Sequence, residues 1–173
     1  MTQTSPRETV RVDLGERSYD IVIGPGLIAE AGAQIAARNP GIRCAVVTDR
    51  NVAAAHLDAL LESLAASGIE AAPLVLEPGE KTKRFDELVH VCDHVLAARL
   101  ERGDAVLALG GGVIGDLSGF AAGIVRRGMG FIQIPTSLLA QVDSSVGGKT
   151  GINSPHGKNL IGVFHQPELV LAD

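Results

Sequence analysis

Alternating hydrophobic and polar side chains mark the first predicted element of the chain. Residues 10–14 and 19–23 both alternate in this way, and the polar stretch Gly15-Glu16-Arg17 separates them. A period of two predicts strands with one buried face, so we expect these two segments to form a β-hairpin. The Ala-rich segment Leu27–Arg38 follows Gly24-Pro25-Gly26 and predicts a short helix.

Short apolar runs then alternate with segments of helical period. Cys44–Thr48 and Ala105–Leu109 are unbroken runs too short for helices, which predicts strands covered on both faces. Further strands are predicted at Pro73–Leu76, Phe131–Ile134 and Leu169–Leu171, and helices at Val52–Ala66, Phe85–Leu96 and Leu117–Val125. Strands that alternate with helices of this length predict parallel βαβ units. The predicted fold class is therefore α/β, a doubly wound and mainly parallel sheet with an N-terminal β-hairpin.

One segment, Asp143–Gly162, does not follow this alternation. It holds five glycines, a proline and two lysines with no steady period, which predicts a long loop with a functional role. Lys149 and Lys158 flank Asn153 and Asn159, and ammonium groups with amides nearby suit a phosphate or carboxylate ligand. Solvated surface lysines remain the alternative.

The stretch Gly110-Gly-Gly-Val-Ile-Gly115 has the spacing G-x-G-x-x-G between a predicted strand and a predicted helix. Glycines let the backbone approach a pyrophosphate, and the helix N-terminus adds unpaired N–H groups. A tight turn with close strand–helix packing is the structural alternative. Asp116, expected in the first helical turn, is either a partner of the helix dipole or a polar contact to a nicotinamide.

The position of this motif differs from the usual dinucleotide-binding layout. Several elements precede it, and Pro135 stands near the place where an acidic residue for the ribose is expected. Asp49, however, ends the earlier strand Cys44–Thr48, and a carboxylate there could accept both ribose hydroxyls. Val146–Thr150 resembles the end of a phosphate-binding P-loop, but Asp143 stands where that motif needs glycine.

Composition narrows the classes of partner. A net charge of −5 argues against nucleic-acid binding, and 3% aromatic residues without Trp exclude a base-stacking platform. No apolar stretch is long enough to span a membrane, and residues 1–8 lack a signal-peptide pattern. Cys44 and Cys92 are expected to be unpaired core residues of a reducing compartment, so the expected location is cytoplasmic.

The histidines do not predict a metal site. His90 and His94 lie four residues apart on a helix beside Asp93, but no third ligand is near, so solvated side chains are expected. His156 and His165 are interpreted as loop or packing residues, with ligand contact as the alternative.

Three long stretches, Gly110–Ala122, Phe131–Thr150 and Gly157–Pro167, resemble the 3-dehydroquinate synthase family of sugar-phosphate cyclases. The similarity runs from about Val10 to the last residue. It implies that residues 1–173 are an NAD-binding α/β domain, and that the family's helical, metal-binding second domain is missing from this chain. The implied reaction is the NAD-dependent cyclisation of 3-deoxy-D-arabino-heptulosonate 7-phosphate to 3-dehydroquinate, with loss of phosphate, in the shikimate pathway.

The resemblance also implies roles for individual residues. The cofactor-binding positions are Asp49, Asn51, Gly79, Glu80, Lys83, Gly111, Gly112, Val113, Ile114, Gly115, Asp116, Thr136, Ser137, Lys149 and Lys158. The catalytic positions are Asp143, Lys149, Asn159 and Arg127. Arg127 matches an arginine that enters the neighbouring subunit's phosphate site, which implies a homodimer. Pro78 stands where the family usually has Asp.

The family's divalent metal, zinc or cobalt, is held by a glutamate and two histidines of the second domain. None of the histidines of this chain matches them, so the chain alone is expected to be inactive. Three other functions stay open. One is another sugar-phosphate cyclase, and a second is a related metal-dependent polyol or alcohol dehydrogenase, which would not need the Lys149–Asn159 loop. The third is a non-catalytic nucleotide-binding module.

Overall fold

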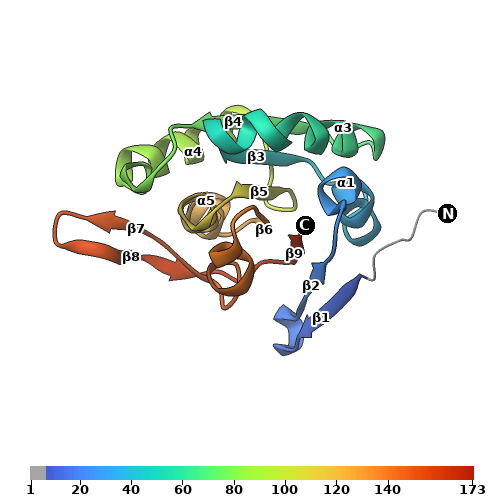
Figure 1. The fold of residues 1–173 in the computed structure, drawn as a ribbon. Helices are drawn as coiled ribbons and strands as arrows, with labels where there is room; N and C mark the ends of the chain where they lie inside the picture. Colours follow the sequence, from blue (N-terminus) through green and yellow to red (C-terminus); the bar gives the residue numbers. More distant parts are fainter. Residues whose placement is uncertain (1–6) are drawn as a thin grey trace.

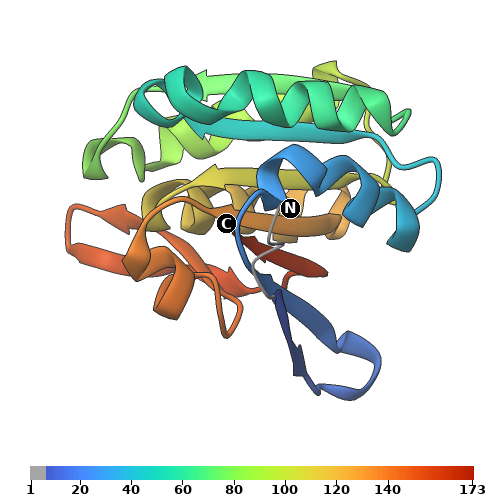
Figure 2. The ribbon, with the colours of Figure 1, turned by 45° about the vertical axis from the view of Figure 1, so that its right-hand side comes forward.

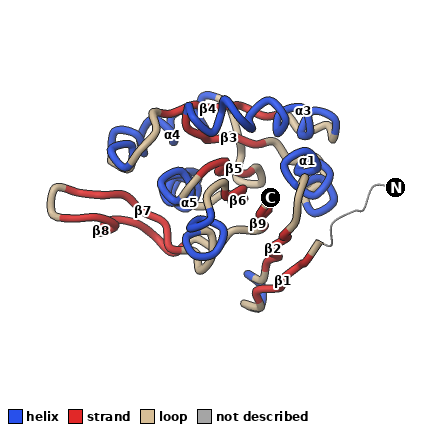
Figure 3. Tube along the Cα trace, in the orientation of Figure 1, coloured by secondary structure: helices blue, strands red, loops and turns tan. Residues whose placement is uncertain are grey.

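The computed structural model describes residues 7–173, which form a seven-stranded sheet and a separate two-stranded ribbon (Figures 1 and 3). Across the sheet the strands are β1 (Glu8–Val12), β2 (Tyr19–Ile23), β9 (Leu169–Ala172), β6 (Gly130–Pro135), β5 (Ala105–Gly110), β3 (Cys44–Asp49) and β4 (Ala71–Leu76). Every neighbouring pair is parallel except β1 and β2. Residues 1–6, which carry most of the N-terminal stretch without a signal-peptide pattern, lie outside the described part.

Helices cover both faces of this sheet (Figure 2). Helices α1 (Leu27–Arg38) and α3 (Asp58–Ala66) pack on one face, and α4 (Phe85–Ala97) and α5 (Gly112–Ile124) pack on the other. Cys44 and Val46 of β3 join the first core, whereas Ala45 and Val47 join the second. The central strands are therefore buried on both faces, and the predicted doubly wound α/β class is confirmed.

Shorter helical segments complete the fold. Helix α2 (Arg50–Val52) continues through a π-helical turn, Ala53–Leu57, into α3. A second π-helical turn spans Ala140–Ser144, and 3-10 turns span Gly15–Arg17, Glu80–Thr82 and Val125–Arg127. No helix within residues 7–173 has the length and apolar character that crossing a membrane requires.

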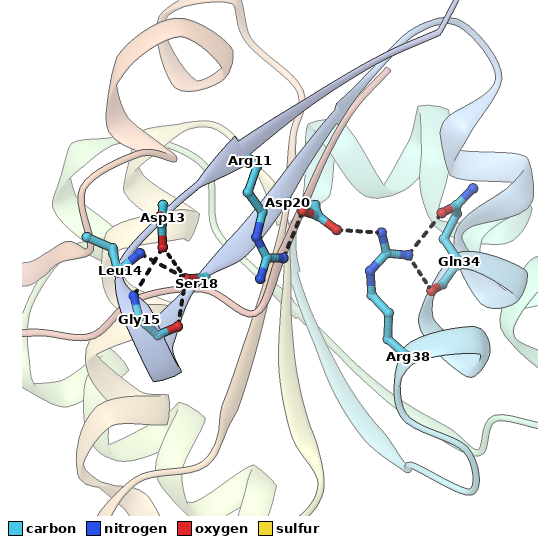
Figure 4. Close-up of polar contacts among 8 residues, drawn as sticks. All are labelled: Arg11, Asp13, Leu14, Gly15, Ser18, Asp20, Gln34 and Arg38. Carbon is cyan, nitrogen blue, oxygen red and sulfur yellow. Dashed lines mark hydrogen bonds and ion pairs between the residues drawn. The ribbon is translucent and has the colours of Figure 1, made fainter.

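The N-terminal hairpin is antiparallel, as predicted, but β1 is almost entirely exposed, whereas β2 buries Tyr19, Ile21 and Val22 and leaves Ile23 exposed. Tyr19 and Ile21 lie in the core, whereas Val10 of β1 is 41% exposed, because β1 is the edge strand of the sheet. Figure 4 shows how ionic contacts hold this edge. The carboxylate of Asp20 accepts from Arg11 of β1 at 3.0 Å and from Arg38 of α1 at 3.2 Å.

The expectation that Asp143–Gly162 is a loop was wrong for most of its length. Strands β7 (Lys149–Ser154) and β8 (Gly157–Phe164) form an antiparallel hairpin that projects beside α5 (Figure 1). Gly151 and Gly162 face each other in it, and a Cβ on Gly162 would lie 1.9 Å from the Thr150 carbonyl oxygen. Glycines at these close contacts interrupt the alternation of apolar residues that normally indicates a strand.

The hairpin packs on a face of α5 made of glycines four residues apart. A Cβ on Gly119 would lie 2.4 Å from Thr150 Cγ2, and a Cβ on Gly123 would lie 2.7 Å from Val163 Cγ2. Ile152 of β7 is fully buried in the core that α5 shares with the sheet. The absence of side chains on this face therefore fixes the distance between the hairpin and α5.

We expect Gly119→Ala to destabilise the protein by roughly 1–3 kcal/mol, because Thr150 and the Phe131 ring would have to move. At a helical position where the added methyl group meets no other atom, the same change would instead stabilise the protein by about 1 kcal/mol. Urea unfolding measures the difference. Gly103→Ala is the matched control, since no atom lies within 4 Å of the added Cβ, and it should be near neutral. A stabilised Gly119→Ala variant would contradict the proposed close packing.

Candidate functional site

The glycine-rich motif is itself the start of α5. Strand β5 ends at Gly110, Gly111 is the N-cap, and the helix begins at Gly112 instead of at Leu117 as predicted. The Gly115 amide donates to the Gly111 carbonyl at 3.0 Å and closes the first turn. Glycines have poor helix propensity, so the residue pattern that predicts a helix begins about one turn after the helix itself does. Asp116 consequently lies in the second turn, not the first.

The N-terminus of α5 is open to an anion. No side chain among the described residues caps it, so the amides of Gly112, Val113 and Ile114 are donors without intrahelical partners. A Cβ on Gly112 would lie 3.0 Å from Ser144 Oγ, and one on Gly111 would lie 3.4 Å from Ser137 Oγ. Glycine therefore keeps the space above these amides clear. The helix dipole and these amides without intrahelical partners together suit a phosphate group.

Asp49 lies next to this motif because β3 and β5 are neighbours. Thr48 pairs with Leu109, so Asp49 stands beside Gly110. After β3 the chain continues into helices on one face of the sheet, whereas after β5 it continues into α5 on the other face. Ligands of α/β sheets bind at such a point, where neighbouring strands are followed by helices on opposite faces. One carboxylate oxygen of Asp49 caps α2, accepting from the Asn51 and Val52 amides at 2.9 and 3.1 Å. The second oxygen has no partner among residues 7–173.

The residues after β6 reach the same edge of the sheet. The Thr136 amide donates to the Gly110 carbonyl at 3.0 Å, which places Thr136 beside the glycine motif. Ser137 Oγ accepts from the Ala140 amide at 3.3 Å and lies over Gly111. The predicted pair of hydroxyl residues is therefore close to the amides that begin α5.

Lys83 connects three separate segments of the site. Its side chain is 5% exposed, and its Nζ donates to the carboxylate of Asp116 on α5 and to Oδ1 of Asn159 on β8. Burial raises the pKa of Asp116, and the hydrogen bond from Lys83 opposes that rise. The turn Gly79–Lys83 is thereby fixed against α5 and the hairpin. Gly79 has a φ of +104°, which lets the chain turn into this position.

Glu80 and Lys158 form the outer part of this cluster. Glu80 Oε1 accepts from Asn153 Nδ2 at 2.7 Å and lies 3.8 Å from Lys158 Nζ. The sequence predicts that the Asn153 side chain binds an anionic ligand. Both of its polar atoms bond within the protein instead, because Nδ2 donates to Glu80 and Oδ1 accepts from the Asn159 amide at 3.0 Å. The turn residues Ser154–Gly157, which close the hairpin, are the sequence signal that could have predicted that Asn153 and Asn159 lie on paired strands.

A hollow of about 590 Å³ lies between α5 and the hairpin. Asp116, Asp143, Lys149 and Asn159 line it, with Leu160 and Phe164 among its apolar lining residues. Lys149 is exposed and has no ion-pair partner among the described residues, so its ammonium group is available to an anion. The hollow therefore combines acidic and basic groups beside the N-terminus of α5.

Arg127, His90 and His94 lie apart from the residues that line the hollow, whereas His156 lies in the turn of the hairpin and His165 follows Phe164. Arg127 is exposed beyond the far end of α5, and it and Arg126 adopt left-handed φ values of +62° and +54°. His94 contacts the Ala72 carbonyl at 3.1 Å, so it is not simply solvated, and His165 contacts the Met129 carbonyl at 2.8 Å. Within residues 7–173 no cluster of three or more His, Cys, Asp or Glu could hold a metal ion. Cys44 and Cys92 are both unpaired, as expected.

Comparison with known proteins gives consistent matches. Residues 73–173 match the family described as 3-dehydroquinate synthase N-terminal. A 3-dehydroquinate synthase of Rhizobium rhizogenes is 69% identical over 173 residues, which are 100% of this chain and 46% of that protein. The chain thus spans about half the length of the curated relatives that it matches.

Two solved structures have the same fold. The crystal structure of 2-deoxy-scyllo-inosose synthase, complexed with carbaglucose-6-phosphate, NAD+ and Co2+, matches with a TM-score of 0.88 at 26% identity, covering 96% of this chain and 45% of that one. The 2-epi-5-epi-valiolone synthase of Streptomyces hygroscopicus subsp. jinggangensis, with NAD+ and Zn2+ bound, matches with a TM-score of 0.82 at 34% identity, covering 94% and 44%.

We expect Asp116→Leu to destabilise the protein by roughly 3 kcal/mol, because it leaves the buried ammonium of Lys83 without its counter-charge. The double variant Lys83→Met/Asp116→Leu should recover most of this loss, because it removes both charges. Urea unfolding measures both values. Lys81→Met, on the same turn but exposed, is the control and should change little. A double variant as unstable as Asp116→Leu would disprove the pairing argument.

Proposed function

Because the chain belongs to the 3-dehydroquinate synthase family, we propose that it is the NAD-binding half of a 3-dehydroquinate synthase. The full protein would convert 3-deoxy-D-arabino-heptulosonate 7-phosphate to 3-dehydroquinate with loss of phosphate. The observation that carries the proposal is the convergence of Asp49, the open N-terminus of α5 and the lysine-bearing hairpin at the carboxyl edge of one sheet.

The residues at this edge fit NAD. The amides of Gly112, Val113 and Ile114 would bind the pyrophosphate, since glycines keep side chains away from it. The second carboxylate oxygen of Asp49 would accept from the adenosine ribose, with Asn51 beside it. Ser137 lies over Gly111 and Thr136 lies beside Gly110, and both would contact the cofactor from the β6 side. NAD held by these residues would supply reversible hydride-transfer chemistry.

The hollow beside α5 would receive the sugar phosphate. Lys149 carries an ammonium group without an ion-pair partner in the described part of the chain and would bind an anionic group of the substrate. Asn159 offers an amide to substrate hydroxyls, and Asp143 faces the hollow as an acceptor. Asp116, whose pKa burial raises, would lie between the cofactor and the substrate. Arg127 points elsewhere, so its role would be in a partner subunit.

The described residues do not fit a metal site. The solved cyclases carry Co2+ or Zn2+. We therefore propose that a divalent metal is held by residues outside this sequence.

A homodimer and a cytoplasmic location stay predictions. A dehydrogenase of similar fold would differ in outcome, since it would accumulate NADH and release no phosphate.

The full-length protein should release phosphate from 3-deoxy-D-arabino-heptulosonate 7-phosphate when supplied with NAD and a divalent metal, and a chelator should abolish the release. The purified 173-residue chain should bind NAD weakly and release none, because it lacks a metal site within its described part. A phosphate-release assay measures both. Net NADH production without phosphate would favour the dehydrogenase, and turnover by the 173-residue chain would refute the assignment of the metal to another region.

A complementation assay tests the homodimer and the role of Arg127. Full-length Arg127→Ala and Lys149→Met variants should each be inactive, because each lacks one side chain of every site. Their mixture should recover about a quarter of the wild-type phosphate release, because half of the dimers are mixed and each holds one intact site. Mixing Lys149→Met with Asn159→Ala is the control and should recover none. Equal recovery in both mixtures, or in neither, would exclude a shared site.

A further inference from the structure

Asn153 occupies the point where the hairpin meets the turn that carries Lys83. Its backbone amide donates to the Lys83 carbonyl at 2.9 Å. Its side-chain Nδ2 donates to Glu80 at 2.7 Å, and its Oδ1 accepts from the Asn159 amide at 3.0 Å. One residue thus fixes the backbone of Lys83, the backbone of Asn159 and the carboxylate of Glu80.

The bond to Asn159 is significant because Asn159 has an unusual backbone conformation. Its φ of +58° is in the left-handed region, which residues other than glycine adopt at an energetic cost. Asparagine tolerates this region better than most residues, but the conformation persists only where neighbours hold it. Asn153 Oδ1 supplies a direct bond to the amide of that residue. Without this hydrogen bond, the Asn159 backbone can relax from the left-handed region to a negative φ.

Asn159 and Lys83 then act on Asp116. Lys83 Nζ is held between Asn159 Oδ1 and the Asp116 carboxylate. A shift of either the Lys83 backbone or the Asn159 backbone would displace the ammonium group from Asp116. We propose that Asn153 is a positioning residue that holds Lys83 and Asn159 in the arrangement in which they face Asp116 at the nicotinamide end of the cofactor site. This inference rests on the proposed NAD site.

Two ligands separate this role from a general structural one. NAD carries the nicotinamide, whereas ADP-ribose keeps the adenosine and pyrophosphate but lacks it. Calorimetric titration of the 173-residue chain should show that Asn153→Ala weakens NAD binding about tenfold, because the variant loses both side-chain hydrogen bonds of Asn153. ADP-ribose affinity should stay unchanged. His156→Ala, on the same hairpin turn and exposed, is the matched control and should alter neither.

Hydrogen exchange provides the second measurement. In Asn153→Ala the Asn159 amide should lose its protection, while the amides of β3 and β5 keep theirs. Asn153→Asp retains an oxygen that can accept from Asn159 and serves as the rescue variant for that amide, including where alanine unfolds the chain. It should keep the Asn159 amide protected, whereas the second carboxylate that it places beside Glu80 makes its NAD affinity no measure of this bond.

The inference is overturned if Asn153→Ala weakens both ligands equally or weakens neither. It is also overturned if the Asn159 amide keeps its protection in Asn153→Ala. A wild-type chain that binds neither ligand would refute the proposed NAD site instead. In that event the exchange of the Asn159 amide still decides whether Asn153 holds its backbone.

Discussion

The ammonium group of Lys83 must be neutralised inside the protein, and the candidate site is arranged around that requirement. A cation with 5% of its side chain exposed is tolerated only with a counter-charge and further hydrogen-bond acceptors. Asp116 supplies the charge from α5, and Asn159 supplies an oxygen from β8. Segments 33 and 76 residues away from Lys83 are thereby joined at one atom. Helix α5 and the hairpin are therefore coupled through Lys83.

The sequence predicted the sheet well because its central strands are covered on both faces. An unbroken apolar run such as Ala105–Leu109 has few alternatives to a buried parallel strand, and the structure places β5 at Ala105–Gly110. The start of α5 was predicted too late because the glycines that begin it carry no apolar period and little helix propensity. A site built on glycine is therefore difficult to delimit from residue patterns alone.

The hairpin was not predicted for a related reason. Its strands use Gly151 and Gly162 for close backbone contact and lay Ile152 against α5, so burial follows the packing partner and not a period of two. The residue types of the site were recognisable from the sequence and its resemblance to a family. Their contacts were not, since the bonds of Asn153 and Lys83 depend on which segments the tertiary fold brings together.

The pairing of β2 with β9 has a consequence for the order in which the protein can fold. Strand β9 lies between β2 and β6, and its partner residues Asp20 and Leu169 are far apart in sequence. The carboxylate of Asp173 also accepts from the Gly26 and Ile28 amides, which stabilises the start of α1. During synthesis, β2 and α1 leave the ribosome long before these partners exist. Helix α1 can pack against α3 early, but the edge of β2 stays unpaired until β9 has been translated, which favours slow, late docking of the N-terminal hairpin.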